Sequence, residues 1–113
     1  FTTNDIVSVG LDADNEAVYF GLNGTWLNSG DPTSGASKTG AFDLPNSGST
    51  YFMGFSPYKG GSSASGAGQA NFGTPPFSIS SANADADDQG SFEYAVPSGY
   101  FALCTKNLAE YGG

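Results

Sequence analysis

Acidic side chains have the greatest capacity for chemistry in this sequence, and they gather in two places. Asp85, Asp87 and Gln89, followed by Gly90, match the opening positions of a calcium-binding loop. The twelfth position of that loop is Val96, where calcium coordination requires a bidentate Glu. We therefore expect a solvated acidic turn here rather than a metal site, with calcium binding as the alternative.

The second cluster consists of Asp12, Asp14 and Glu16. These side chains suit a turn, because short acidic residues hydrogen-bond the neighbouring backbone. Calcium binding is again the weaker alternative, so we predict no metal site and no cofactor.

Catalysis would need a base or a nucleophile, and the sequence contains no histidine, the commonest base. Carboxylates alone can hydrolyse glycosides, which leaves a fragment of a glycan-degrading protein as a weak alternative. The single cysteine, Cys104, lies in the strand-like run 102–105 and is expected to be a buried small hydrophobe rather than a reactive thiol. We predict a protein that is not an enzyme.

The elements that position these residues start with a hairpin. Ile6–Leu11 is an apolar, β-branched run, and Val18, Phe20 and Leu22 alternate with smaller or polar residues at the period of a half-buried strand. The acidic cluster at 12–16 is the turn between them. A second turn follows at Asn23 and Gly24, and then Trp26.

Further strands are expected along the chain, and no 12-residue window has a helical stripe. The run Thr50–Ser56 is so apolar that it predicts a central strand buried on both faces. Phe20, Phe52 and Phe72 are the expected core residues. Shorter strands are predicted at 41–44, 69–72, 77–79, 92–96 and 100–105. The expected fold class is all-β: an antiparallel β-sandwich with long Gly/Ser loops and little or no helix.

Two loops, Asn28–Gly40 and Tyr58–Gly68, are dominated by glycine, serine and proline, and are the predicted binding region. The candidate ligand-binding residues are Trp26, Asn28, Asp31, Tyr58 and Lys59. Trp26 could stack on a glycan, although packing across the end of the sheets is the favoured interpretation.

Composition limits the classes of partner. The 113 residues suffice for one domain, with 38% hydrophobic and 14% aromatic residues for a core. The formal charge of −8, with 3 Lys and Arg in total, argues against nucleic acid and anionic membranes. No apolar run approaches the roughly 20 residues that span a bilayer, so membrane insertion is not expected.

Three motifs resemble one family. The run from Leu11 and Asp12 through Phe20 and Asn23 to Trp26 resembles the core hairpin of SPRY domains. Ala70–Phe77, which reads Ala-Asn-Phe-Gly-Thr-Pro-Pro-Phe, is similar to a later strand of that family. Ser98–Leu108 resembles the tail that follows SPRY domains in bacteriophage and prophage structural proteins.

The resemblance spans about residues 6–108 and implies a SPRY-like β-sandwich in a virion. It implies a binding module whose partners are other virion proteins or a host-surface protein or glycan, in attachment or in decoration of the particle. A purely structural cement or fibre subunit is the alternative. Only the later half of the family's domain is matched, so we expect the sandwich to be completed by an earlier segment or by neighbouring copies, with a homotrimer as the first guess. The alternative is a rearranged, smaller sandwich closed by the further strands at 77–79 and 92–105. The start at Phe1, without Met, is compatible with processing, a fragment or a partial sequence.

Overall fold

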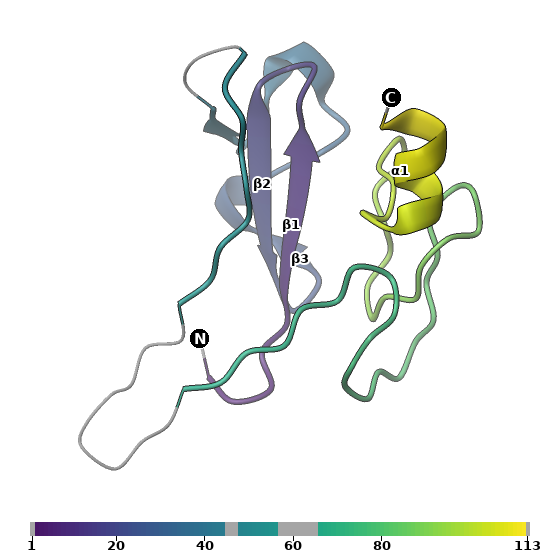
Figure 1. The fold of residues 1–113 in the computed structure, drawn as a ribbon. Helices are drawn as coiled ribbons and strands as arrows, with labels where there is room; N and C mark the ends of the chain where they lie inside the picture. Colours follow the sequence, from purple (N-terminus) through teal and green to yellow (C-terminus); the bar gives the residue numbers. More distant parts are fainter. Residues whose placement is uncertain (1, 45–47, 57–65, 113) are drawn as a thin grey trace.

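The computed structural model describes residues 2–44, 48–56 and 66–112 (Figure 1). Its elements are strands β1 (Val7–Asp12), β2 (Ala17–Leu22), β3 (Thr25–Trp26) and β4 (Phe42–Asp43), short 3-10 turns at Leu27–Ser29 and Gly35–Ser37, and helix α1 (Thr105–Tyr111). Strand β2 is central: it pairs with β1 on one edge and with β3 and β4 on the other, always antiparallel. The predicted antiparallel sheet is confirmed, and with one short helix the architecture is compatible with a small all-β fold.

Both predicted hairpin turns are present, and local side-chain bonds hold them. Asp12 accepts hydrogen bonds from the backbone N–H and the side-chain amide of Asn15, at 3.0 and 2.8 Å. Asn23 and Gly24 both have positive φ, as the tight turn between β2 and β3 requires. The Asn23 side chain also accepts a hydrogen bond from the Ile6 backbone N–H at 2.9 Å. The turn residues thus fix the register of β1 against β2.

The two faces of the sheet differ in side-chain size. Val9 pairs with Phe20 and Leu11 with Val18, so these side chains share one face with Val7 and Leu22. The opposite face carries small or polar residues apart from Tyr19: Ser8, Gly10, Asp12, Ala17 and Gly21. We call the first the apolar sheet face and the second the inner face.

The inner face is where the core lies. Tyr19 is the largest fully buried side chain of the described residues, at 1% exposure. A Cβ added to Gly10 would lie 3.2 Å from the Tyr100 ring, and one added to Gly21 would lie 3.2 Å from the Trp26 ring. Small residues on this face therefore allow two aromatic rings to lie directly on the sheet.

The C-terminal segment packs beside the sheet and consists mainly of loops (Figure 1). Within residues 66–104 no strand forms, and Asn83 and Phe92 make an isolated antiparallel bridge. The N–H of Ser91 donates to the carbonyl of Gly73 at 2.9 Å. These few backbone bonds leave side chains to organise this segment.

Several predicted strands are wrong. Residues 50–56, expected as a central strand, form no strand and are exposed. Residues 69–72 and 77–79 form no strand, and 92–96 forms only the bridge at Phe92. The apolar pattern was present, but a strand also needs a neighbouring strand to bond, which periodicity cannot supply. The short strand expected at 41–44 is present as β4.

The expected core phenylalanines are wrong as well. Phe20, Phe52 and Phe72 are 36%, 92% and 47% exposed. The buried hydrophobic residues among those described are Ala17, Tyr19 and Ala102. Phe52 lies in the exposed segment 50–56, and Phe20 packs edge to face with Phe42 on an exposed face of the sheet.

The predicted strand at 100–105 is replaced by a turn and by α1. Cys104 immediately precedes the helix and is partly buried, rather than lying within a strand as expected. The helix spans only 7 residues, too few for a helical stripe in the sequence. Among the described residues, no helix has both the length and the apolar character needed to cross a membrane.

The exposure of Phe52 gives a prediction about stability. We expect Phe52→Ala to change the free energy of unfolding of the isolated chain by less than about 0.5 kcal/mol, as exposed substitutions do. If Phe52 lay in a buried central strand, the same substitution would lower the free energy of unfolding by about 3–5 kcal/mol. Urea unfolding followed by Trp26 fluorescence distinguishes the two, and a loss above about 2 kcal/mol would contradict the exposed position.

Candidate functional site

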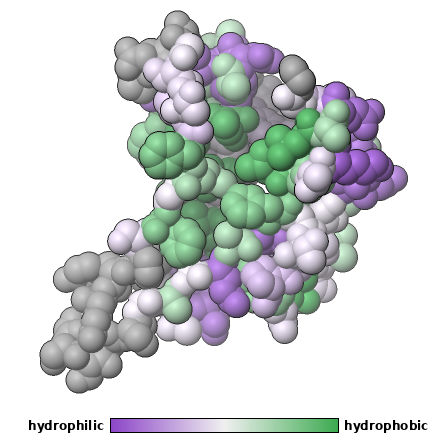
Figure 2. Space-filling view, in the orientation of Figure 1, coloured by the Kyte–Doolittle hydropathy of each residue, from purple (hydrophilic) through white to green (hydrophobic). Residues whose placement is uncertain are grey.

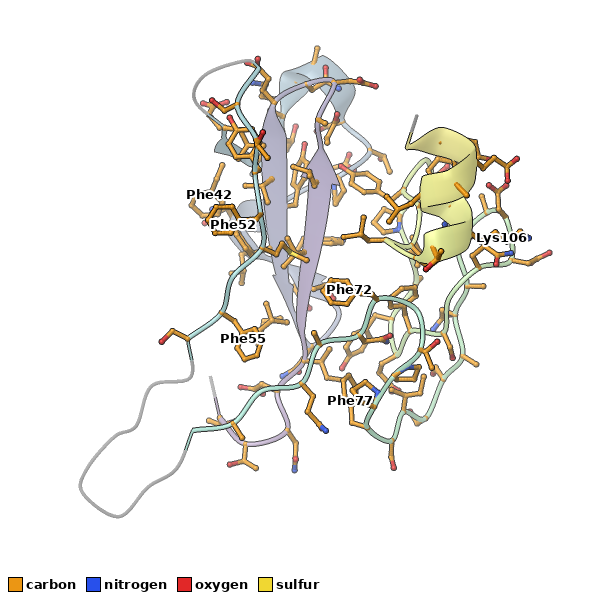
Figure 3. All side chains as sticks on the ribbon, in the orientation of Figure 1. Phe42, Phe52, Phe55, Phe72, Phe77 and Lys106 are labelled. Atoms are coloured by element: carbon orange, nitrogen blue, oxygen red, sulfur yellow. The ribbon has the colours of Figure 1, made fainter. Side chains whose placement is uncertain are left out.

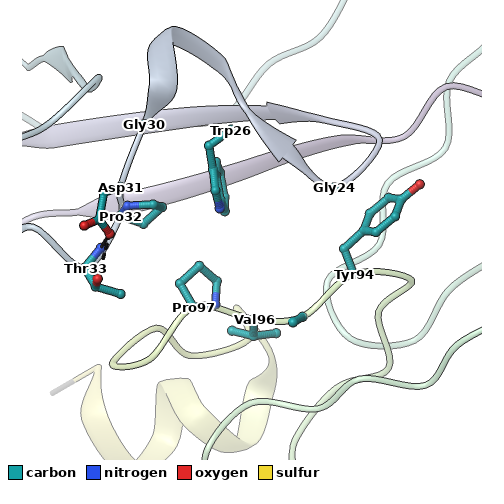
Figure 4. A pocket seen from close by; sticks show the side chains of 10 residues that line it. Gly24, Trp26, Gly30, Asp31, Pro32, Thr33, Tyr94, Val96 and Pro97 are labelled. Atoms are coloured by element: carbon teal, nitrogen blue, oxygen red, sulfur yellow. Dashed lines mark hydrogen bonds between the residues drawn. The ribbon is translucent and has the colours of Figure 1, made fainter.

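The loop after β3 and the segment before Tyr100 enclose an open cleft of about 420 Å³ (Figure 4). Its volume falls in the range of about 300–1,000 Å³ that is typical of ligand sites. The lining residues are Gly24, Trp26, Gly30, Asp31, Pro32, Thr33, Tyr94, Ala95, Val96 and Pro97. Two chain segments far apart in the sequence therefore build one site.

Trp26 forms the middle of the cleft. It lies in β3, paired with Gly21 of β2, and its ring packs on the inner face. It also meets Tyr19 edge to face, with ring centroids 6.5 Å apart. These contacts fix the indole, so the ring is a rigid wall that is half-exposed to a ligand. In this position Trp26 packs against the sheet, as the favoured interpretation expects, and also lines the cleft, as its expected binding role requires.

Tyr94 stands at one end of the cleft, against the turn at Gly24 (Figure 4). A Cβ on Gly24 would lie 2.7 Å from the Tyr94 ring, and its φ is +84°. Glycine is needed here both for the left-handed turn and for the close approach of the ring. The hairpin turn thus positions a side chain from the distant segment.

Tyr100 holds the two walls together. Its hydroxyl donates to the carbonyl of Pro32 at 3.0 Å, and its backbone N–H donates to the carbonyl of Pro97 at 3.1 Å. Burial, with a smaller contribution from the nearby Asp12 charge, raises the pKa of Tyr100 to about 12, so the phenol keeps its proton. One residue therefore sets the distance between Pro32 and Pro97.

Asp31 lies at the other end of the cleft, opposite Tyr94 (Figure 4). Its Oδ1 accepts hydrogen bonds from the hydroxyl and the backbone N–H of Thr33, at 2.6 and 2.9 Å. These two bonds lower the pKa of the Asp31 carboxyl, which is therefore charged at neutral pH. Within the described part of the chain, Oδ2 accepts no hydrogen bond.

The predicted site residues are only partly brought together. Trp26 and Asp31 both line the cleft. Asn28 lies in the neighbouring 3-10 turn, exposed and with a φ of 56°, and does not line it. Tyr58 and Lys59, with most of the loop Tyr58–Gly68, lie outside the described residues.

Sequence reasoning missed the second wall, which contains Tyr94, Val96 and Pro97. The alternation of Phe92, Tyr94 and Val96 before Pro97 predicts a strand at 92–96 instead. The clue available was Pro97, because a proline ends a strand and leaves the preceding residues free to line a loop.

The acidic loop holds a buried carboxylate, that of Asp85, which binds neighbouring segments. The prediction of a solvated acidic turn is therefore wrong for Asp85. That side chain is 7% exposed, whereas Asp87 and Asp88 are exposed as expected. Its Oδ1 accepts hydrogen bonds from the N–H groups of Asp87 and Gln89, and its Oδ2 accepts from the N–H of Ala102 and the amide of Asn107. The four distances are 3.0, 2.9, 2.8 and 2.8 Å.

These bonds decide the charge state of Asp85. Burial raises its pKa, but the hydrogen bonds from Ala102, Gln89, Asn107 and Asp87 more than offset this, and the pKa is lowered. All four donors stabilise the carboxylate without a metal ion. In the part of the chain that the structure covers, no group of three or more Asp, Glu or Cys side chains could hold one.

The apolar sheet face is the other notable surface. Its side chains are exposed although they are large: Val7 by 44%, Val9 by 39%, Leu11 by 51% and Phe42 of β4 by 47%. Phe52 and Phe55 lie on the same side of the molecule, as does Phe72 (Figure 3). Hydrophobic residues cover the middle of this side in the space-filling view (Figure 2).

Comparisons with known proteins gave no match, whether to a family model, to a curated protein or to a solved structure.

Proposed function

We propose that the chain is a non-enzymatic binding module of a bacteriophage structural protein, and that it attaches through its apolar sheet face to another protein of the virion. The observation that carries the proposal is the exposure of this face. The resemblance of the hairpin and of the run 70–77 to SPRY domains suggests the setting. In this role the loop end of the module stays free to decorate the particle or to contact a host.

The size of the exposed surface supports docking to a protein. Phe20, Phe42, Phe52, Phe55 and Phe72 expose 36%, 47%, 92%, 67% and 47% of their surface. At roughly 150–250 Å² for a whole aromatic side chain, these five expose on the order of 600 Å². Monomeric proteins rarely expose more than a few hundred Å² of continuous apolar surface, and standard interfaces bury about 800 Å² per partner.

The acidic residues around the apolar sheet face favour a different protein, rather than a second copy of this chain, as the partner. Acidic residues lie at the ends of the strands that carry this face, namely Asp5, Asp14, Glu16 and Asp43. Lys38 also lies nearby, but it pairs with Asp43 at 3.0 Å. Two copies packed face to face would bring like charges together, whereas an apolar surface rimmed by Lys or Arg would complement them. The homotrimer expected from the sequence would then form through a different surface.

Substituting Phe52 and Phe55, which lie on the same side of the molecule as the apolar sheet face, tests this proposal. We expect Phe52→Ser combined with Phe55→Ser to leave the melting temperature of the isolated module unchanged, because both side chains are mostly exposed. The occupancy of the protein in purified particles should fall at least about tenfold, the equivalent of about 1.4 kcal/mol of lost docking energy. Quantitative mass spectrometry of the particles measures this.

A matched control removes apolar surface elsewhere. Leu108→Ser does so on α1, where Leu108 is 51% exposed, and should leave occupancy unchanged. Full occupancy of the double variant would count against the sheet face as the docking surface. Equal losses in both variants would mean that general solubility, and not this face, determines assembly.

A further inference from the structure

The cleft beside Trp26 is separate from the apolar sheet face, and its two ends differ in chemistry. The Asp31 carboxylate stands at one end and the Tyr94 ring at the other, with Trp26 and Pro97 between them (Figure 4). A ligand that fills the cleft must therefore present different chemistry along its length: a polar donor at the Asp31 end and an apolar body over the rings.

The charge at the polar end is negative. Asp31 is ionised because its Oδ1 holds both donors of Thr33, while Oδ2 accepts no hydrogen bond from the described residues. Among the described residues, no lysine or arginine lines the cleft. The whole chain carries a formal charge of −8, which repels anions and attracts cations toward such a site. An anionic ligand is therefore disfavoured on electrostatic grounds.

The remaining lining is too apolar for a sugar. A saccharide presents hydroxyl groups all round its ring, and each one needs a polar partner when it leaves water. Besides Asp31, the polar side-chain groups on the walls are the Thr33 hydroxyl, the Tyr94 phenol and the Trp26 indole N–H, and the Thr33 hydroxyl already donates to Asp31. Val96 and Pro97 are partly exposed and offer only hydrocarbon to a ligand side chain. This surface suits a methylene chain better than a ring of hydroxyls.

We infer that the cleft binds a primary alkylammonium group, in the form of a lysine side chain presented by another protein. The ammonium donates to Oδ2 of Asp31, and the four-carbon stem lies over Trp26 and Pro97, toward Tyr94. A flexible stem with a compact charge at its end fits this order of surfaces. The indole face adds an attraction for the cation when the ammonium passes over it. The inference does not depend on the proposed docking of the sheet face.

The chain contains one tryptophan, so its fluorescence reports directly on this cleft. We expect Nα-acetyl-lysine methylamide, titrated at constant ionic strength, to give a saturable change in Trp26 emission with a dissociation constant in the millimolar range, about 1–20 mM. The matched neutral probe, with an acetyl group on Nε, should bind at least about tenfold more weakly because the charge is absent.

Two variants complete the test. Asp31→Asn keeps an oxygen that accepts from Thr33 but removes the charge, and should weaken the lysine probe at least about tenfold without lowering the melting temperature. Asp14→Asn removes an equal charge in the β1–β2 turn and should change nothing. No saturable response, equal binding of the neutral probe, or unchanged binding by Asp31→Asn would each overturn the inference. A response to glucose matching that to the lysine probe would assign the cleft to saccharides instead.

Discussion

Asp85→Ala is expected to cost at least about 3 kcal/mol of the free energy of unfolding. The substitution leaves the backbone N–H of Ala102 and the amide of Asn107 without their buried acceptor, and it frees the N–H groups of Asp87 and Gln89. Each unsatisfied buried donor costs about 1–3 kcal/mol, and bonds to a charged acceptor are the stronger kind. Amide exchange measures the result: the N–H of Ala102 should lose its protection first.

Two variants control this prediction. Asp85→Asn keeps the shape but turns an NH₂ group toward donors, so it should also lose about 2 kcal/mol or more. Asp88→Asn removes a charge from the same loop at an exposed position and keeps a residue type that tolerates its φ of +57°. It should stay within about 0.5 kcal/mol of the parent. Equal stability of Asp85→Ala and Asp88→Asn would show that the buried carboxylate does not organise this segment.

The ionisation of Asp85 makes the stability of the fold depend on pH. The pKa of Asp85 is lower in the folded chain than its ordinary value of 3.8. The carboxylate therefore stabilises the fold above that value, and the stabilisation is lost as the pH falls through the lower folded pKa. Asp85→Asn should show a shallower loss of stability below about pH 4 than the parent does, with the contributions of other carboxylates unchanged.

Tyr19→Ala should produce the other large effect, a loss of about 3–5 kcal/mol. Tyr19 is 1% exposed, and its ring packs against Trp26. Its hydroxyl lies 3.3 Å from the hydroxyl of Ser34. Removing it opens a cavity under the indole and leaves the cleft wall unsupported. Urea unfolding gives the free energy, and a shift of Trp26 emission toward the value in water would report the exposed ring.

Leu11→Ala provides the comparison on the opposite side of the same sheet. Leu11 is 51% exposed on the apolar sheet face, so its truncation should cost about 1 kcal/mol or less. If both truncations cost the same, the inner face would not be the core.

The sequence was informative where structure is decided by neighbours in the chain. Asp12 binds Asn15 within the β1–β2 turn, and Asn23 and Gly24 have the positive φ of a tight turn, so both turns and the strands they join could be predicted from residue types. The short strand around Phe42 could also be predicted, although its pairing with β2 could not. Trp26 and Asp31 could likewise be proposed, because Trp26 directly follows the turn at Asn23 and Gly24 and Asp31 lies in the loop after it.

The rest depends on contacts between distant segments. Thr50–Ser56 has the pattern of a buried strand, but no described strand pairs with it and no described layer covers it. Asp85 has the pattern of an exposed acidic turn, and only its contacts with Ala102 and Asn107 make it a buried centre. The second wall of the cleft, from Tyr94 to Pro97, is likewise positioned by Tyr100 and not by its own composition.

The bond between Tyr100 and Pro32 has a consequence for the order of folding. It joins positions 68 residues apart, whereas Asp85 reaches Asn107 over 22 residues, and the hairpin closes over a few. Closing a longer loop costs more chain entropy before any contact forms, and a hairpin closes within about 1–10 μs. We therefore expect the hairpin and the Asp85 segment to assemble as separate local units, and the cleft to form only when Tyr100 reaches the carbonyl of Pro32.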